Sequence, residues 1–363
     1  MHILFKRYNM SEKIIKVGIS HGDINGIAYE LILKTFEDIR IFEMCIPVIY
    51  GSSKVLAYQR KVMNLPQVNF NTIHHVGDAG MNRLNVIDCG NEETTVEFAR
   101  STPESESLAQ SAFQLALKDL QSGHIDVLVM APSNFDETAD LSAITAGGKH
   151  PLKILLNDSF RIALVSDKIP LSETASLLKV DFLTAKIKAL HSALIHDFMV
   201  TNPRIAVLSL NPGVGINEKL FGTEENEVII PAVKVANDAG IICFGPYSAD
   251  NFFGNGEYTK FDATLAMYYD QGLIPFRSIA FEGGIYYWAD LPFVVIASDD
   301  GVSYEKAGKN ESSEISFRNA LYSAIDIFNT RKLDSEIHAN PLKKQYFERG
   351  SDNEKLDLTK DEG

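Results

Sequence analysis

The sequence has few cysteines and a deficit of basic residues. Its 363 residues include three cysteines, Cys45, Cys89 and Cys243, which lie far apart and form no Cys-x-x-Cys motif. This spacing indicates neither a disulfide framework nor a cysteine metal site, so we expect three ordinary buried thiols. The 34 basic and 48 acidic residues give a net charge of −14, the wrong sign for neutralising a phosphate backbone. We therefore expect no nucleic-acid partner.

Long apolar runs are also missing. A helix that crosses a bilayer needs about 18 consecutive apolar residues, and no segment approaches that length. The apolar part of residues 1–7 is too short for a secretory signal, so we expect a cytoplasmic protein with no membrane partner. The 45% content of hydrophobic residues is nevertheless enough for one large or two medium globular domains.

Short β-branched runs alternate with longer helical patterns along the chain. This alternation predicts an α/β fold built on a mostly parallel sheet. The segment 134–149 reads as a surface loop, and the residues after 342 form a highly charged tail. The predicted strands are 13–20, 46–50, 125–130, 161–165, 204–210, 241–245, 263–267 and 293–297. The predicted helices are 105–121, 224–240 and 313–328.

Polar loops follow several of the predicted strands. In open parallel sheets, ligands bind outside the carboxyl ends of the strands, so these loops are the candidate sites. The loop 21–30 contains Asp23 and two glycines, and it fits either a phosphate-binding turn or a plain tight turn. Asp250 and Asp270 follow later strands, and each fits either a ligand site or the start of a helix.

The distribution of histidine excludes one class of site. None of the nine histidines lies between His196 and His338, although that span holds the most site-like loops. A metal bound only by histidines of the second half is therefore excluded. The Gly-x-Ser-x-Gly motif of the serine hydrolases is absent as well.

Many of these loops together resemble one family, that of 4-hydroxythreonine-4-phosphate dehydrogenase in vitamin B6 biosynthesis. This family is distantly akin to the isocitrate and isopropylmalate dehydrogenases. The resemblance covers residues 17 to about 328. The motifs that carry it include Gly22-Asp23, Asn25-Gly26-Ile27, Ala131-Pro132, Ile169-Pro170-Leu171, Leu210-Asn211-Pro212, Glu224-Glu225, Gly245-Pro246, Ala249-Asp250, Asp270-Gln271-Gly272, Leu291-Pro292 and Ala307-Gly308.

The resemblance implies a homodimer of two-domain α/β subunits with an interdomain cleft that the partner completes. Residues 1–131 with 297–342 would form the nucleotide-side domain, 132–296 the second domain with the dimer interface, and 343–363 a charged tail. The family implies NAD as cofactor, here near Asp300, Gly301, Ala307 and Gly308. It also implies a divalent metal, which polarises the substrate alcohol and stabilises the enolate formed on decarboxylation.

The sequence departs from the family at the metal and substrate positions. Lys168, Gly213 and Tyr269 stand where the family has its three histidine ligands, so we predict that the divalent metal is absent. The Gly-His-Thr-Glu motif cannot be found, and Arg277 replaces a lysine. An asparagine, an arginine and a histidine of the family are replaced here by Tyr286, Val295 and Asp300.

Two interpretations remain open. The chain is either a diverged paralogue with a binding, regulatory or hetero-oligomeric role, or an NAD-dependent oxidoreductase that acts on another substrate without a metal. The candidate acid/base residues are Lys168, Tyr269 and Asp270, and the candidate ligands of a small-molecule substrate are Asp23, Asn211, Asp250 and Arg277. A weakly retained parent activity is a third possibility.

One hypothesis concerns Lys168 in particular: its ammonium could fill the vacated metal site by pairing with Asp250 or Asp270. An open cleft would favour catalysis. A cleft filled by Tyr269, Tyr286 and Trp288 would favour a protein without catalysis.

Overall fold

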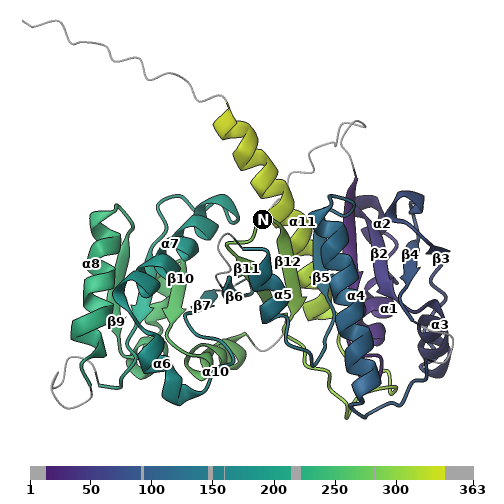
Figure 1. Cartoon of the computed structure of the whole chain (residues 1–363), viewed down its shortest axis with the longest axis horizontal. Coiled ribbons are helices and arrows are strands. Elements are labelled where there is room, and N and C mark those ends of the chain that lie inside the picture. The colour runs from purple at the N-terminus through teal and green to yellow at the C-terminus, as the bar shows by residue number, and fades with distance from the viewer. Residues whose placement is uncertain are drawn as a thin grey trace, which may run out of the picture.

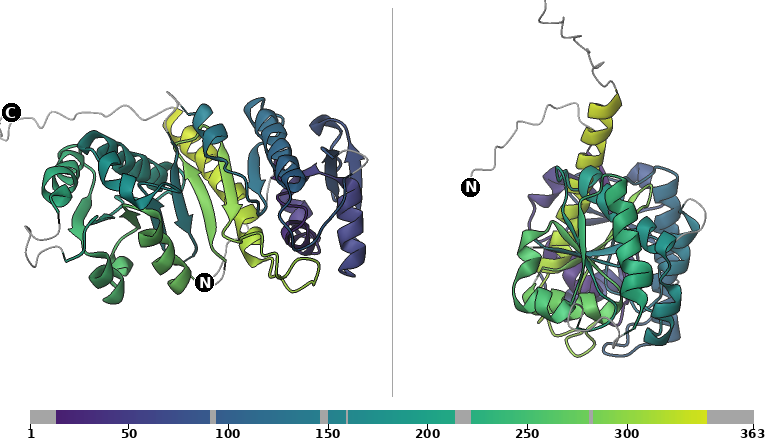
Figure 2. Two further views of the ribbon diagram at one scale, coloured as in Figure 1. Left: turned by 60° about the horizontal axis from the view of Figure 1, so that its bottom comes forward. Right: turned by 90° about the vertical axis from the view of Figure 1, so that its left-hand side faces the viewer.

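One continuous sheet of 12 strands runs through both halves of the molecule (Figure 1). The computed structural model describes residues 14–90, 94–145, 150–158, 160–213, 222–280 and 283–339. The strand order is β3-β4-β2-β1-β5-β12-β11-β6-β7-β10-β8-β9. Helices cover both faces of this sheet (Figure 2), which confirms the predicted α/β class with a mostly parallel sheet.

The half that begins with β3 is entirely parallel within the described pairs. Its inner strands are buried on both faces, which explains why they are largely apolar; Val17 and Ile19 in β1, for example, have no exposed surface, whereas the edge strand β3 is mostly exposed. The strands are β1 (Ile15–Ser20), β2 (Cys45–Gly51), β3 (Phe70–Ile73), β4 (Leu84–Asp88), β5 (Val127–Met130) and β12 (Val294–Ser298). The helices are α1 (Ala28–Thr35), α2 (Ile41–Met44), α3 (Ser53–Val62), α4 (Pro103–Gln121) and α11 (Ile315–Ala339), with a 3-10 turn at Val76–Asp78.

The other half joins the first through antiparallel strands. β11 is antiparallel to β12 on one side and to β6 on the other, and β6 is antiparallel to β7. The strands here are β6 (Leu152–Leu156), β7 (Arg161–Leu164), β8 (Ile205–Leu208), β9 (Cys243–Tyr247), β10 (Ala263–Ala266) and β11 (Ile285–Ala289). The helices are α5 (Thr138–Ala143), α6 (Leu171–Leu177), α7 (Val180–His196), α8 (Ile230–Asp238), α9 (Ala249–Gly254) and α10 (Tyr269–Ile279), with a 3-10 turn at Glu257–Lys260.

The long helix α11 crosses the junction between the halves. It contacts β5 and β12 on one side of the junction and β11 and α7 on the other. Its buried face, which includes Phe317, Leu321 and Ile325, packs on the sheet, while its C-terminal end extends beyond the body of the molecule (Figure 1). Each fully buried aliphatic or aromatic side chain contributes about 1.5 to 3 kcal/mol to folding, so this packing holds the halves together.

All eight predicted strands are present, within a few residues of the predicted ends. Four further strands, β3, β4, β6 and β11, were not predicted. The segment predicted as a loop at 134–149 contains the short helix α5, and residues 146–149 lie outside the described part. The predicted helix 224–240 begins as a π-helical segment, Glu225–Ile229, before α8. Pro231 lacks the N–H that a regular helix uses, which explains the irregular start.

Several other predictions concern the limits of the chain and its thiols. Residues 296 and 297, where the sequence placed a domain boundary, both lie in β12, and the division into domains stays a prediction. The charged tail 343–363 lies outside the described residues. Cys45 and Cys243 are buried free thiols as expected, whereas Cys89 is only partly buried. Within the described part of the chain, no helix combines the length and apolar character that crossing a membrane requires.

Candidate functional site

The three predicted catalytic residues line one pocket. Lys168 follows β7, while Tyr269 and Asp270 begin α10 directly after β10. β7 and β10 are adjacent parallel strands, so the loops at their carboxyl ends meet at one edge of the sheet. The pocket has a volume of about 230 Å³ and is lined by Ser166, Lys168, Ile169, Leu171, Thr174, Tyr268, Tyr269 and Asp270. Lys168 has a φ of 44°, a left-handed conformation that costs a non-glycine residue about 1 kcal/mol.

Beside this pocket lies a cluster of four charged side chains, called here the charged centre: Glu137, Lys153, Asp167 and Lys168. The Lys153 ammonium forms an ion pair with Asp167 and lies 3.3 Å from Glu137 Oε1. The Lys168 ammonium lies 3.4 Å from the other oxygen of Glu137. Lys153 and Glu137 are buried, whereas the side chain of Lys168 is 45% exposed. Two ammonium and two carboxylate groups therefore balance each other.

Burial and charge act in opposite directions on Lys153. Burial by itself lowers the pKa of this ammonium, but the carboxylates of Asp167 and Glu137 outweigh that effect and hold the pKa above its usual value. Lys153 is therefore a permanently charged group at neutral pH.

Two aromatic rings of β11 cover the Lys153 ammonium. Its nitrogen lies 5.5 Å from the ring centroid of Tyr286 and 5.2 Å from that of Trp288. Lys153 pairs directly with Trp288 across the antiparallel β6–β11 ladder, so both side chains project from the same face of the sheet. The aromatic rings thus fold inward, as one of the two sequence-based alternatives expected, while Tyr269 remains at the wall of a small open pocket.

Arg277, a predicted substrate ligand, is already engaged within the protein. Its Nη2 lies 2.7 Å from Asp299 Oδ1 and donates to the Tyr286 hydroxyl at 3.1 Å. The Tyr286 hydroxyl donates in turn to Asp299. The hydrogen bond to Asp299 raises the pKa of Arg277, and burial raises the pKa of Tyr286. The fork of Arg277 is therefore matched by an internal carboxylate.

Two further predicted ligands also have internal partners. The Asn211 amide donates to Glu224 at 2.8 Å and to Glu225 at 3.0 Å. Asp250 lies in the first turn of α9, where it accepts a hydrogen bond from Ser248 that lowers the pKa of its carboxyl group. Asp270 is exposed in the first turn of α10.

The ion pair of Lys168 differs from the expected one. Among the described residues its ammonium pairs with Glu137 and not with Asp250 or Asp270. Glu137 lies just before α5, in the segment 134–149 that was predicted to be a surface loop.

Three loops that follow β1, β5 and β12 come together at the carboxyl ends of these parallel strands. The buried Asp23 accepts hydrogen bonds from the Tyr304 hydroxyl at 2.6 Å and from the Asn25 N–H at 2.8 Å. The Asp23 N–H donates to the Pro132 carbonyl at 2.8 Å. A Cβ on Gly26 would lie 2.6 Å from the Val302 carbonyl, so this approach requires glycine. Three loops far apart in the sequence are thus bound to one another.

Two of the predicted cofactor residues, Asp300 and Gly301, are adjacent in sequence but have different environments. Burial raises the pKa of Asp300 to about 6, and its Oδ2 has no hydrogen-bond partner. Gly301 is exposed, and a Cβ added to it would meet no atom within 4 Å, so a ligand has room to approach here. Ala307 is buried, and Gly308 has a φ of 74° beside the ring of Phe98.

The residues at the three positions where the resemblance places metal ligands do not fit a divalent metal. They provide an ammonium at Lys168, no side chain at Gly213, and at Tyr269 a phenol whose pKa is raised by burial. Gly213 has a φ of 72°, where a histidine would be strained. Over the described ranges, no group of three or more His, Cys, Asp or Glu side chains is arranged to hold a metal ion.

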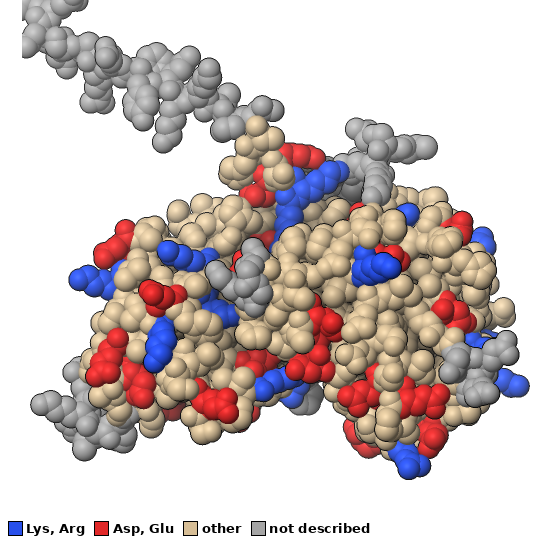
Figure 3. Space-filling model, in the orientation of Figure 1, with Lys and Arg blue, Asp and Glu red and all other residues tan. Residues whose placement is uncertain are grey.

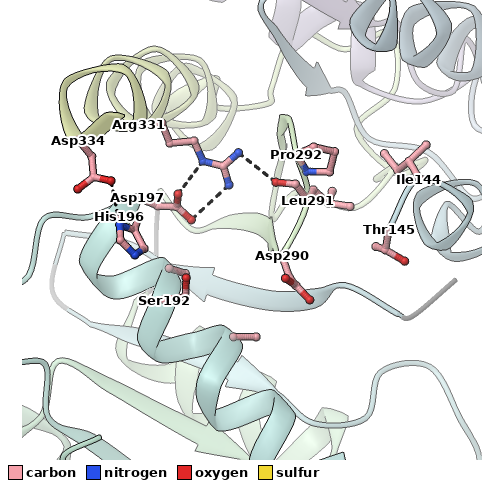
Figure 4. Close-up of a pocket in the computed structure, with 12 residues that line it drawn as sticks. Ile144, Thr145, Ser192, His196, Asp197, Asp290, Leu291, Pro292, Arg331 and Asp334 are labelled. Atoms are coloured by element: carbon pink, nitrogen blue, oxygen red, sulfur yellow. Dashed lines mark hydrogen bonds and ion pairs between the residues drawn. The ribbon is translucent and has the colours of Figure 1, made fainter. Parts of the chain in front are cut away.

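A larger groove of about 630 Å³ lies elsewhere, between α7, α11 and the β11–β12 connection (Figure 4). Arg331 lies in its wall and binds Asp197 and the Leu291 carbonyl. Of the motifs that carry the resemblance, only Leu291-Pro292 reaches this groove. None of the predicted site residues lines it, whereas the three predicted catalytic residues line the smaller pocket.

Lys153, Glu137 and Asp167 were not predicted to be site residues. For Lys153 a signal existed, because it is the one charged residue in the apolar run Leu152-Lys153-Ile154-Leu155-Leu156. A charged side chain is rarely buried without a partner.

Acidic side chains also gather along the lower edge of the molecule, the edge at which α6 and α10 lie (Figure 3).

Comparison with known proteins agrees with the motifs. The model of the family described as pyridoxal phosphate biosynthetic protein PdxA matches residues 43–324. The chain belongs to the PdxA family. It is 45% identical over 360 residues to a 4-hydroxythreonine-4-phosphate dehydrogenase of Bacteroides thetaiotaomicron, covering 96% of this chain and 98% of the relative. A relative of the same name from Aquifex aeolicus is 31% identical, with 84% and 96% covered.

Solved structures show the same fold. The 4-hydroxythreonine-4-phosphate dehydrogenase of Klebsiella pneumoniae superimposes with a TM-score of 0.72 at 24% identity, over 88% of this chain and 99% of that one. The enzyme of the same name from Burkholderia phymatum gives a TM-score of 0.69 at 24% identity, over 87% and 99%.

Proposed function

We propose that this PdxA family member has lost the metal-dependent dehydrogenase reaction and serves as a cytoplasmic small-molecule binding or regulatory protein. The observation that carries the proposal is the chemistry at the three ligand positions. An ammonium, a glycine in a left-handed conformation and a half-buried phenol replace three metal-binding side chains. Without a Lewis acid, neither the alcohol oxygen nor the enolate of the parent reaction is stabilised.

The electrostatics of the site also oppose the parent substrate. A phosphate group needs unpaired cationic donors, preferably an arginine fork. Here Arg277 is paired with Asp299, Lys153 with Glu137 and Asp167, and Lys168 with Glu137. Few unpaired cationic donors therefore remain to bind the phosphate group of the parent substrate.

The family resemblance supports two further parts of the proposal. NAD is the nucleotide that the family uses, and we place it at the loop of Asp300 and Gly301, where Gly301 faces open space. NAD would bring a hydride acceptor, and the loop would only position it. A homodimer is the assembly that the family implies.

The alternative is a metal-independent oxidoreductase that acts on another substrate. A tyrosine base in such an enzyme needs a lowered pKa, whereas burial raises that of Tyr269. Lys168 is paired with Glu137, and Asp270 is exposed to solvent. These environments favour binding over catalysis.

The test is to measure metal content by elemental analysis and to titrate the purified protein with NAD and with Mg²⁺, Mn²⁺ or Zn²⁺ by calorimetry. NADH formation from 4-hydroxythreonine 4-phosphate is followed in parallel, with the Bacteroides thetaiotaomicron relative as control. We expect no stoichiometric metal and no NADH. Stoichiometric metal together with turnover near that of the control would refute the proposal, whereas NAD binding without turnover agrees with it.

A further inference from the structure

The buried ammonium of Lys153 occupies the neighbourhood of the family's metal positions. Its partner Asp167 directly precedes Lys168, the first ligand position, and its partner Glu137 also binds Lys168. We propose that Lys153, rather than Lys168, is a built-in cation that takes the place of a divalent ion at this centre and keeps such an ion from binding. The inference rests on the proposed function and identifies the residue that enforces it.

The surroundings of Lys153 are those of a bound cation. Two carboxylates, from Asp167 and Glu137, converge on the nitrogen, and the rings of Tyr286 and Trp288 cover its other sides. Aromatic faces attract cations most strongly when water is excluded, and the Lys153 side chain is only 6% exposed. A second cation at this place would meet direct repulsion from the ammonium.

Lys168 fits this role less well, although it stands at a ligand position. Its side chain is 45% exposed and has a single ion pair at 3.4 Å, whereas Lys153 is buried between two carboxylates. The hypothesis that Lys168 itself fills the metal site is therefore replaced by one in which Lys153 fills it and Lys168 pairs only with the second oxygen of Glu137.

The sheet holds Lys153 in place. The residue lies in the middle strand pair of the junction, where β6 and β11 are antiparallel and Lys153 is the register partner of Trp288. A side chain on a buried strand is positioned more rigidly than one on a loop. The cation therefore cannot move away as an exchangeable ion would.

A first experiment measures thermal unfolding of Lys153→Met, with the exposed Lys188→Met on α7 as the matched control. Removing Lys153 leaves Asp167 and Glu137 as unpaired carboxylates, so we expect the melting temperature to fall by about 5 °C or more. Lys153→Arg should recover part of this loss, and Lys188→Met should change little. Equal melting temperatures for Lys153→Met and Lys188→Met would overturn the inference.

A second experiment measures the metal directly. The double variant Lys168→His/Tyr269→His restores two histidine ligands, and Lys153→Ser is then added to it. We expect Zn²⁺ or Mn²⁺ affinity, measured by calorimetry, to rise at least tenfold when Lys153 is removed, because Asp167 and Glu137 become available as ligands. Circular dichroism verifies that the variants fold.

An unchanged metal affinity in the triple variant would overturn the inference. Should the triple variant not fold, the single variant Lys153→Ser is titrated with Mn²⁺, and the absence of any stabilisation by Mn²⁺ overturns it equally. These outcomes differ from failure of the proposed function, which is metal-dependent turnover by the unmodified protein.

Discussion

Two ion-pair networks in this protein join basic side chains to buried carboxylates. They differ in how far their cations are exposed to solvent. In the charged centre, Lys153 and Lys168 share Glu137, and Lys153 also pairs with Asp167. At the junction of the halves, Arg331 of α11 binds Asp197 and the Leu291 carbonyl (Figure 4). It also donates to the Tyr287 hydroxyl. We call this second group the junction network.

The difference lies in how the donors are used. Arg331 directs Nε, Nη1 and Nη2 at protein acceptors 2.6 to 3.4 Å away, so little of its hydrogen-bonding capacity remains. In the charged centre, by contrast, the outermost cation is Lys168, whose half-exposed side chain lies in the wall of the pocket. A planar guanidinium matches several fixed acceptors, whereas an ammonium is a point charge on a flexible stem. The first network suits structure and the second suits a binding site.

The largest expected effect comes from breaking the junction network. Arg331→Met leaves Asp197 buried without its cation, which should lower the free energy of unfolding by about 3 to 5 kcal/mol. The measurement is urea denaturation, with the exposed Arg100→Met as control. Ligand binding at the small pocket should be unaffected. A loss as small as that of the control would show that the junction network contributes nothing to stability.

A buried titratable group without an ion pair provides the next test. Burial lowers the pKa of His21 from 6.5 to about 4, so the unfolded chain takes up a proton between these values before the folded protein does. Stability is therefore lost as pH falls from about 6.5 to 4, by about 3 kcal/mol in total. His21→Gln should remove this part of the pH dependence in denaturation measured from pH 7 to 4. An unchanged dependence of stability on pH in His21→Gln would contradict the assignment of this loss to His21.

The smallest effects distinguish the inner and outer parts of the charged centre. Asp167→Asn weakens the pairing of the buried Lys153 and should cost about 2 kcal/mol. Lys168→Met removes a half-exposed pair and should cost about 0.5 kcal/mol or less after solvent screening. Both are measured by urea denaturation. Equal losses of stability in the two variants would contradict a charged centre in which the pair of Lys153 is buried and that of Lys168 is half exposed.

The sequence predicted those parts of the fold that depend on local pattern. The eight predicted strands are apolar runs followed by polar loops, and Lys168, Tyr269 and Asp270 meet because β7 and β10 are parallel neighbours. β6 was not predicted because Lys153 interrupts its apolar run. β11 was also missed, although its aromatic residues favour a strand. The charged centre depends on the register between these two strands, which local pattern does not encode.

The order of strands also has a consequence for synthesis. β12 pairs with β5, yet residue 294, where β12 begins, is made 164 residues after residue 130, where β5 ends (294 − 130). At about 5 to 20 residues per second, the ribosome needs roughly 8 to 33 seconds for this interval. During that time β5 is an unpaired apolar edge, the kind of surface that joins other chains. The nascent chain is therefore most exposed to aggregation before its last strand and helix emerge.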